Sequence, residues 1–151
     1  MNDTNTNLGE ATYEYTYDAP RELVFECMTT AEHLCKFWGP TGMSTPIENI
    51  IVEPRAGGRF ETIMVNDANG EQYPMAATFV EVSPPERIVF TEPGVEGGMT
   101  TSIVFNDLGD GRTHVVSHQT NMPVMFLTEE ARAGMITSFD KLNAYVKSLA
   151  A

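Results

Sequence analysis

The sequence predicts an α+β fold in which a strongly curved antiparallel β-sheet wraps around one long C-terminal α-helix. Three observations predict this class. Short β-type apolar segments fill the middle of the chain, turn-forming residues such as Asp67-Ala68-Asn69-Gly70 separate them, and the last segment adopts a helical period. A sheet built from hairpins has one face to cover, and the final helix offers an apolar stripe for it. With 151 residues, 42% of them hydrophobic, a single domain with its own core is expected.

The first segment, 1–10, is polar and aperiodic, so it is predicted to be a frayed end before a single domain over 11–150. Tyr13, Tyr15 and Tyr17 alternate with polar residues, and this period of two predicts a strand with one aromatic face.

Two short helices are predicted next. Pro20 suits the first turn of a helix, because its missing N–H would have no partner there. Thr30 is a candidate N-cap for a second helix through Phe37, and Gly39 and Pro40 end that helix.

The middle of the chain reads as strands separated by Gly, Pro and Asp clusters. Ser83-Pro84-Pro85 and 107–111 mark turns, and 94–98 is predicted to be a loop. The predicted strands cover residues 47–52, 59–65, 72–82, 87–91, 101–106 and 113–120.

The last segment predicts an amphipathic helix of about six turns. Thr128 can cap it, and two glutamates follow where the helix dipole favours negative charge. The apolar stripe, in steps of four and three residues, consists of Met135, Phe139, Leu142, Val146 and Leu149.

Acidic residues outnumber basic ones: nine Lys and Arg stand against 21 Asp and Glu, a formal net charge of -12. Such a surface repels phosphate backbones and anionic lipid, so we expect neither nucleic acid nor membrane as a partner. No segment approaches the run of about 18 apolar residues that a membrane span requires.

The two cysteines, Cys27 and Cys35, lack the C-x-x-C spacing of redox and metal motifs and make no disulfide framework. The segment Met1 to Glu10 shows no apolar core of a signal peptide. We therefore expect a cytoplasmic protein whose reduced thiols are structural.

Four short segments carry a family resemblance: Ala19-Pro20-Arg21-Glu22-Leu23-Val24-Phe25, Phe37-Trp38-Gly39-Pro40, Pro54-Arg55-Ala56-Gly57-Gly58-Arg59-Phe60 and Pro84-Pro85-Glu86-Arg87-Ile88-Val89-Phe90-Thr91. In this order they resemble motifs of the START and birch-pollen-allergen superfamily (SRPBCC), which has the helix-grip fold, in the branch named after the activator of the heat-shock-chaperone ATPase. The resemblance spans roughly 11–150 and implies a cavity between the sheet and the last helix. Gly134-Met135 stands where the family often carries Gly-Trp.

The histidines do not predict a metal site. His114 and His118 lie in one predicted strand, where four residues span about 13 Å, so they cannot share an ion. His33 stands alone in the second short helix. No phosphate loop, nucleophile elbow or complete dinucleotide fingerprint occurs, so no cofactor is expected. We interpret His118 as a polar group inside or at the wall of the cavity.

The cavity is expected to be apolar and adaptable, since the chain has nine methionines, whose flexible thioethers fill irregular spaces. Trp38 is interpreted either as a core plug between the short helices and the sheet or as an aromatic at the cavity mouth. Gln119 is a further polar candidate. The side chains expected to line the cavity are Trp38, Phe60, Met64, Tyr73, Met75, Phe90, His118, Met135 and Phe139.

Three functions remain open from the sequence. The first is binding of a small hydrophobic or amphipathic molecule in this cavity. The second is a cyclase, dehydratase or hydrolase that uses the same cavity, with His118 as the candidate acid or base but no defensible partner for it. The third, implied by the resemblance, is a partner of a chaperone ATPase. A homodimer through the tyrosine-rich first strand or through Tyr145 is also open.

Overall fold

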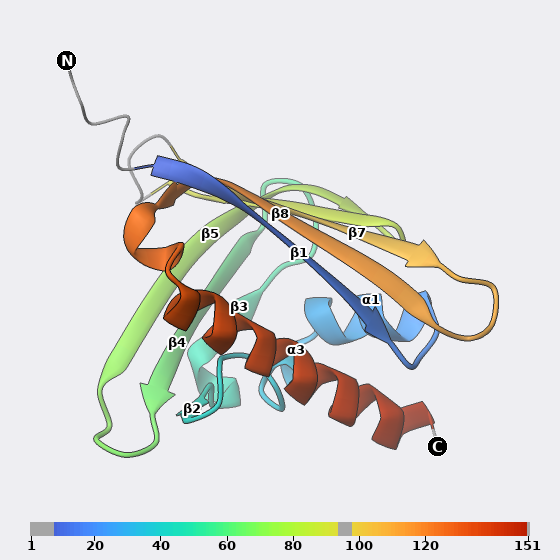
Figure 1. The fold of residues 1–151 in the computed structure, drawn as a ribbon, viewed down its shortest axis with the longest axis horizontal. Helices are drawn as coiled ribbons and strands as arrows, with labels where there is room; N and C mark the ends of the chain where they lie inside the picture. Colours follow the sequence, from blue (N-terminus) through green and yellow to red (C-terminus); the bar gives the residue numbers. More distant parts are fainter. Residues whose placement is uncertain (1–7, 94–97, 151) are drawn as a thin grey trace.

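The computed structural model describes residues 8–93 and 98–150. Figure 1 shows its plan: a curved sheet, with one long helix running across its inner face. The elements in chain order are β1 (Leu8–Tyr17), α1 (Arg21–Thr29), α2 (Ala31–Leu34), β2 (Met43–Ser44), the 3₁₀ helix η2 (Ile47–Asn49), β3 (Ile50–Val52), β4 (Arg59–Asn66), β5 (Gln72–Ser83), β6 (Arg87–Glu92), β7 (Met99–Asp107), β8 (Thr113–Pro123), the 3₁₀ helix η3 (Val124–Phe126) and α3 (Glu129–Ala150).

The sheet has eight strands in the order β1-β8-β7-β6-β5-β4-β2, with β3 also paired to β4, and every pairing is antiparallel. The chain order of strand, two short helices, strands and long helix confirms the predicted α+β, helix-grip-like fold. Within the described residues, no helix has the length and apolar character needed to cross a membrane.

Two sequence predictions about the elements are wrong in detail, and one short strand was not predicted. The predicted frayed end extends too far, because Leu8 pairs with Pro123 and Gly9 with Met122, so β1 begins at Leu8. Backbone pairing of this kind needs no apolar side-chain pattern. The predicted strand 47–52 begins as a 3₁₀ turn, since the backbone N–H of Asn49 donates to the Pro46 carbonyl. The two-residue strand β2 is too short to show any period. Residues 1–7 and 94–97 lie outside the described part.

The core consists of two clusters. The main cluster lies between the short helices, the central strands and the second half of α3, and contains most of the buried aromatic rings. The second, here called the methionine cluster, lies nearer the start of α3. Its buried members are Ala11, Tyr13, Met99 and Met122, and the half-buried Leu127, Met135 and Phe139 pack against it.

The second half of α3 is fastened tightly to β1 and to the chain that follows it. The Tyr15 hydroxyl donates to Asp140 at 2.7 Å, and the Asn143 side chain both accepts from the Asp18 backbone N–H and donates to the Asp18 carboxylate. Leu142 and Val146 keep 1% and 0% of their surface exposed. Burial raises the pKa of the Tyr15 hydroxyl to about 12, helped by the hydrogen bond to Asp140.

Tyr145 is not the exposed flank that the dimer prediction assumed. Its ring packs against the main cluster, and its hydroxyl lies 2.6 Å from Nδ1 of His33. The tyrosines of β1 also point inward, with Tyr13 and Tyr17 buried. These side chains therefore contribute to the core, and the homodimer stays a prediction.

Candidate functional site

The candidate site lies between the inner face of the sheet and α3, where the predicted residues fall in alternate register. On β4, Phe60 and Thr62 are buried while their neighbours in sequence are more exposed, and on β6 Ile88 and Phe90 face the site although Val89 between them is also buried. This period of two arises because successive side chains of a strand point to opposite faces.

Trp38, Phe60 and Phe90 form one aromatic group with Phe79. The Phe60 ring stacks on Phe79 with centroids 5.4 Å apart, and it meets the edges of Trp38 at 5.2 Å and of Phe90 at 5.1 Å. The space left beside these rings is about 10 Å³, roughly the room for one water molecule. Trp38 is therefore packed as a core plug, which is one of its two predicted roles.

Met64 and Met75 lie at the side of this aromatic group, on β4 and β5. Both are half-buried, and Met75 packs against the main cluster. The Met64 sulfur lies so close to Gly39 that a Cβ there would be 2.9 Å from it. Glycine at 39, with a φ of 111°, thus lets the loop after Trp38 lie against β4.

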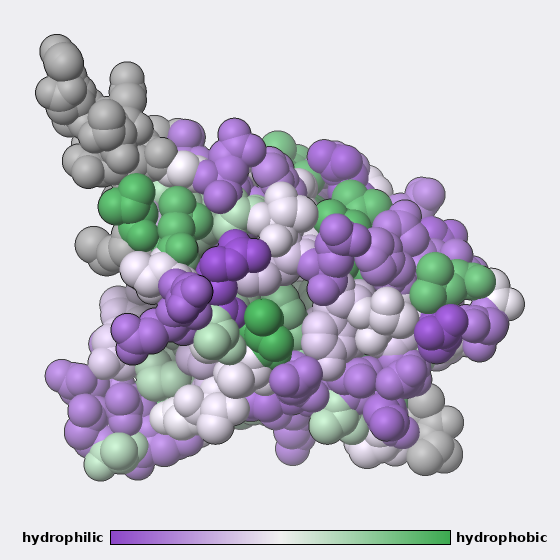
Figure 2. Space-filling model, in the orientation of Figure 1, coloured by the Kyte–Doolittle hydropathy of each residue, from purple (hydrophilic) through white to green (hydrophobic). Residues whose placement is uncertain are grey.

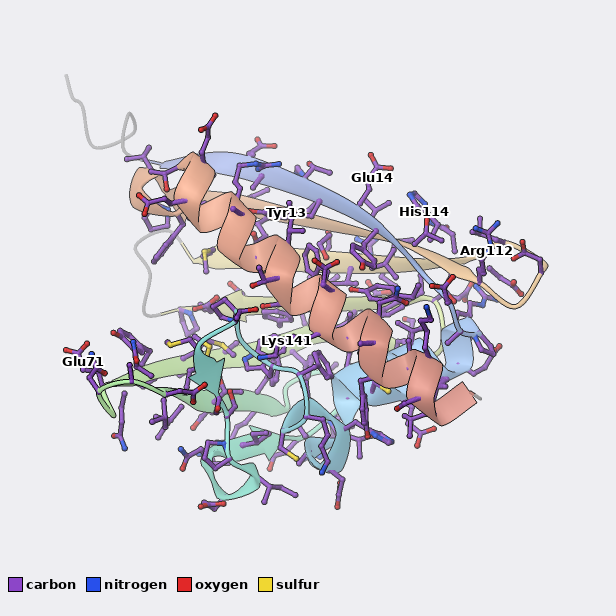
Figure 3. The ribbon with its side chains drawn as sticks, turned by 60° about the horizontal axis from the view of Figure 1, so that its bottom comes forward. Tyr13, Glu14, Glu71, Arg112, His114 and Lys141 are labelled. Atoms are coloured by element: carbon purple, nitrogen blue, oxygen red, sulfur yellow. The ribbon has the colours of Figure 1, made fainter. Side chains whose placement is uncertain are left out.

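Met135 and Phe139 extend the site along the first half of α3. The Phe139 ring contacts Tyr13 and Tyr15 edge-on, with centroids 5.5 and 5.8 Å apart. The guanidinium of Arg132 lies 4.6 Å above the Tyr13 ring. Figure 3 shows Tyr13 beside this part of the helix.

A strap over residues 39–43 joins α3 to the strands on the opposite side. Lys141 Nζ donates to the carbonyls of Gly39 and Met43 at 3.0 and 3.3 Å, and burial lowers the pKa of this amine. The Thr41 backbone N–H donates to the hydroxyl of Thr137. Lys141 points from the helix toward this strap in Figure 3.

Tyr73 was predicted to line the cavity, and the structure contradicts this. Tyr73 pairs with Met64, so it shares the inner face by register, but it lies near the end of the β4–β5 hairpin. There 41% of its surface is exposed, and its hydroxyl donates to Glu71. Figure 3 shows Glu71 at the far tip of that hairpin, beyond the helix. The alternation of side chains along the strand predicted the correct face for Tyr73, but the tip of the β4–β5 hairpin extends beyond α3, so the helix does not cover it.

His118 was predicted to be a polar group inside or at the wall of the cavity, and this is also wrong. It lies on the outer face of the sheet, with Nε2 3.2 Å from Glu10 and Nδ1 2.8 Å from Thr12. His114 pairs in the same way with Glu14 at 3.0 Å, and Figure 3 shows both residues of that pair away from α3. The inward positions of β8 are instead Thr113, Val115 and Gln119.

Two polar side chains on the inner face were not among the predicted site residues. Glu92 follows Phe90 by two residues and pairs with Met99, which places it inside at the end of β6. Burial raises the pKa of its carboxyl from 4.5 to about 7. Thr62 is 1% exposed, and its hydroxyl has no hydrogen-bond partner among the residues that the structure describes. The signal for Glu92 was available in the alternation Ile88, Phe90, Glu92.

Gln119, named above as a further polar candidate, does face the site. It is 8% exposed, and its side-chain amide donates to the Thr101 hydroxyl at 3.3 Å. Within 8–93 and 98–150, its buried carbonyl oxygen Oε1 has no hydrogen-bond partner. Because a buried polar atom without a partner destabilises the fold, this oxygen marks a point where a bound molecule could donate a hydrogen bond.

The cysteines and the acidic side chains outside this site show no arrangement for catalysis or metal binding in the described part of the chain. Burial raises the pKa of the Cys27 thiol to about 12, so little reactive thiolate forms there at neutral pH. Within the described ranges, no three His, Cys, Asp or Glu side chains gather as a metal site would require. A shallow groove of about 420 Å³ lies elsewhere, between α1 and the β5–β6 turn, with Glu22 and Glu26 beside Pro84 and Pro85.

Solved structures share this fold over almost the whole chain. A protein from Chromobacterium violaceum is 23% identical, with a TM-score of 0.80 over 90% of this chain and 96% of that one. An AHSA1-like protein from Aeromonas hydrophila is 18% identical, with a TM-score of 0.78 over 93% and 94% of the two chains. The AHSA1 protein from Silicibacter pomeroyi is 18% identical, with a TM-score of 0.77 over 91% and 97%.

The sequence comparisons agree with the fold. Comparison with curated proteins gives no match. Residues 18–147, most of the domain, match the family described as Activator of Hsp90 ATPase homolog 1-like protein. The four motifs, the helix-grip-like fold and this match together show that the chain belongs to the Activator of Hsp90 ATPase homolog 1-like family, within the SRPBCC superfamily.

Proposed function

We propose that the protein binds a small hydrophobic or amphipathic molecule between the first half of α3 and the inner face of the sheet. The observation that carries this proposal is the change in burial along the helix. Leu142 and Val146 are almost fully buried, whereas Met135 and Phe139, on the same stripe, are only half-buried. The stripe is thus tightly packed around Leu142 and Val146 and loosely packed at its start, and its last member, Leu149, is 43% exposed at the C-terminal end.

The loosely packed end has the composition of an adaptable site. Methionines from β7, β8 and α3 meet there in the methionine cluster, and unbranched thioethers change shape at low energetic cost. Apolar side chains also reach the surface beside it, where Val124 and Phe126 of η3 are 45% and 43% exposed. Figure 2 shows this apolar area at the upper left, over η3.

Binding requires side chains to move, because the space beside the aromatic rings holds only about 10 Å³. The methionines are the parts best able to move, because their side chains are unbranched and flexible. The strap 39–43 is held to α3 by two hydrogen bonds from Lys141 and one from the Thr41 backbone to Thr137, which movement of the strap would break. A ligand that buries apolar surface gains about 25 cal/mol per Å² to offset this rearrangement.

The test is native mass spectrometry with 1-octanol as the probe, with Trp38 fluorescence as a second readout. The informative pair of variants is Met135→Phe and Ile136→Phe. Both add an aromatic ring to adjacent positions of α3, but Met135 faces the methionine cluster and Ile136 is 46% exposed. We expect Met135→Phe to weaken octanol binding at least several-fold and Ile136→Phe to leave it unchanged.

The proposal fails if the native protein binds no octanol up to its solubility limit, or if both variants weaken binding equally. Native spectra of the freshly purified protein, compared with denatured spectra, also reveal any molecule that was retained. Its mass would give the class of the natural ligand.

The two alternatives have less support. The enzymatic hypothesis relied on His118, and the position of that residue on the outer face removes the argument. A role as partner of a chaperone ATPase stays a prediction from the family resemblance. Recovery of the cell's own chaperone in a pull-down with this protein is the direct test of that role.

A further inference from the structure

We propose that the molecule bound at this site carries a protonated amine, which lies against the Glu92 carboxylate while its apolar body lies among the methionines. This inference rests on the binding function proposed above and adds the chemistry of the head group. The arrangement of acceptors on the inner face carries it.

Glu92 is an acidic side chain on the inner face of the sheet, where no interaction in the described part of the fold requires a negative charge. The register of β6 with β7 sets it on the inner face opposite Met99, beside the methionine cluster. Within the described residues, no hydrogen-bond donor and no basic side chain contacts its carboxylate. Burial alone accounts for the raised pKa, with no contribution from a charged neighbour. A desolvated carboxyl without a cation is unfavourable, and a bound ammonium group would remove that cost.

Gln119 provides a second and independent acceptor on the same face. Thr101 of β7 pairs with Phe90 of β6 and with Gln119 of β8, so Gln119 lies two strands across and two residues along from Glu92, about 12 Å between the two backbones. Among the described residues, its Oε1 is buried and has no hydrogen-bond partner. Both polar groups therefore need donors: an ammonium head group against Glu92 supplies N–H donors there, and Gln119 shows that the same face lacks donors elsewhere.

The basic side chains of α3 near this interface are already engaged. Lys141 Nζ donates to the Gly39 and Met43 carbonyls, and Arg132 lies on the Tyr13 ring with an N–H directed to the Thr12 carbonyl. The site therefore offers acceptors to an entering head group, and the two basic side chains of α3 beside it are engaged elsewhere. A carboxylate head group, as in a fatty acid, would meet like charge, whereas an amine would meet opposite charge.

The experiment compares three probes of equal chain length: octylamine, 1-octanol and octanoate, measured by calorimetry at pH 7.5. We expect octylamine to bind about tenfold more tightly than octanol, the gain expected of a partly buried charge-assisted pair, and octanoate to bind most weakly. Glu92→Gln should reduce the octylamine advantage to about twofold or less while leaving octanol binding unchanged.

The matched control is Glu48→Gln. It removes the same charge from an exposed position in η2, so both variants weaken the overall attraction of this chain, with its net charge of -12, for cations to the same extent. The octylamine advantage should survive in this control. Glu92→Asp, which keeps the charge on a shorter stem, should keep part of the advantage and serves as a second variant if Glu92→Gln does not fold.

The outcomes separate the two proposals. If octylamine and octanol bind equally, or if Glu48→Gln and Glu92→Gln reduce octylamine binding alike, the amine inference is overturned while binding at the site stands. If none of the three probes binds the native protein, the binding function itself fails, and the amine inference fails with it.

Discussion

Replacing Glu92 with Gln should make this protein more stable at alkaline pH. In the unfolded chain the carboxyl loses its proton near its ordinary pKa of 4.5, whereas in the folded chain burial raises that pKa to about 7. Between these values the folded state holds a proton that the unfolded state has released, so stability falls as the pH rises. The destabilisation is nearly absent below pH 4.5 and fully developed above pH 7. Glutamine has nearly the same shape and no charge, so the variant avoids this loss of stability at high pH.

The magnitude follows from the two pKa values. An increase from 4.5 to about 7 corresponds to about 3 kcal/mol for a fully buried group. Glu92 is only half-buried, and screening by solvent reduces this to about 1–2 kcal/mol. Most of that difference develops between pH 5 and pH 8. We therefore expect Glu92→Gln to gain about 1–2 kcal/mol over the native chain across this interval.

Urea unfolding at pH 5 and pH 8, followed by the fluorescence of Trp38, the sole tryptophan, measures both chains. Effects of the substitution that do not depend on pH cancel in the comparison. Glu48→Gln, at an exposed position, is the control and should change little between the two pH values. A Glu92→Gln difference that is the same at pH 5 and pH 8 would show that Glu92 is not desolvated in the folded protein and would refute the reasoning.

Three further predictions test the packing around the site. Phe60→Ala should lower the free energy of unfolding by about 3–5 kcal/mol, because it removes a 2% exposed ring that contacts three other aromatic rings. Val80→Ala, at a 56% exposed position, is the control and should lower it by less than about 1 kcal/mol when both variants are unfolded in urea. Gly134→Ala should raise the melting temperature, since alanine stabilises a helix by about 1 kcal/mol over glycine and the new Cβ would lie 3.8 Å from Pro40, an ordinary contact distance. Gly58→Ala should lower the melting temperature, because a Cβ there would overlap the Glu53 carbonyl oxygen. In native protein at pH 8, an aromatic disulfide reagent should label half-buried Cys35 and leave buried Cys27 unlabelled until unfolding; equal labelling rates would contradict the assigned burial.

The sequence alone was enough to predict the class of fold and most of its elements. Alternating residues located β4, β5 and β6 to within two residues, and the spacing of Met135, Phe139 and Leu142 predicted the helix that begins after Thr128. The Thr128 hydroxyl does accept from the backbone N–H of Ala131, as an N-cap should. These features are local, because strand and helix periods are set by neighbours along the chain.

The candidate site was predicted only in part. Trp38, Phe60 and Phe90 come together as expected because large apolar side chains are buried wherever the fold places them. The prediction that Tyr73 lines the cavity is wrong because only the tertiary structure decides how much of the β4–β5 hairpin α3 covers. Glu92 was missed because an acidic residue at the end of a strand usually lies in solvent.

His118 and Gln119 show most clearly where the information in the sequence ends. Their adjacency on β8 fixes that they face opposite sides of the sheet. The sequence does not fix which side α3 covers, because that depends on how distant segments pack together. Only the tertiary structure places Gln119 beneath the helix with a buried, unpartnered oxygen and leaves His118 outside with Glu10. The site therefore contains the amide of Gln119 and not the imidazole of His118, because α3 covers the face on which Gln119 lies.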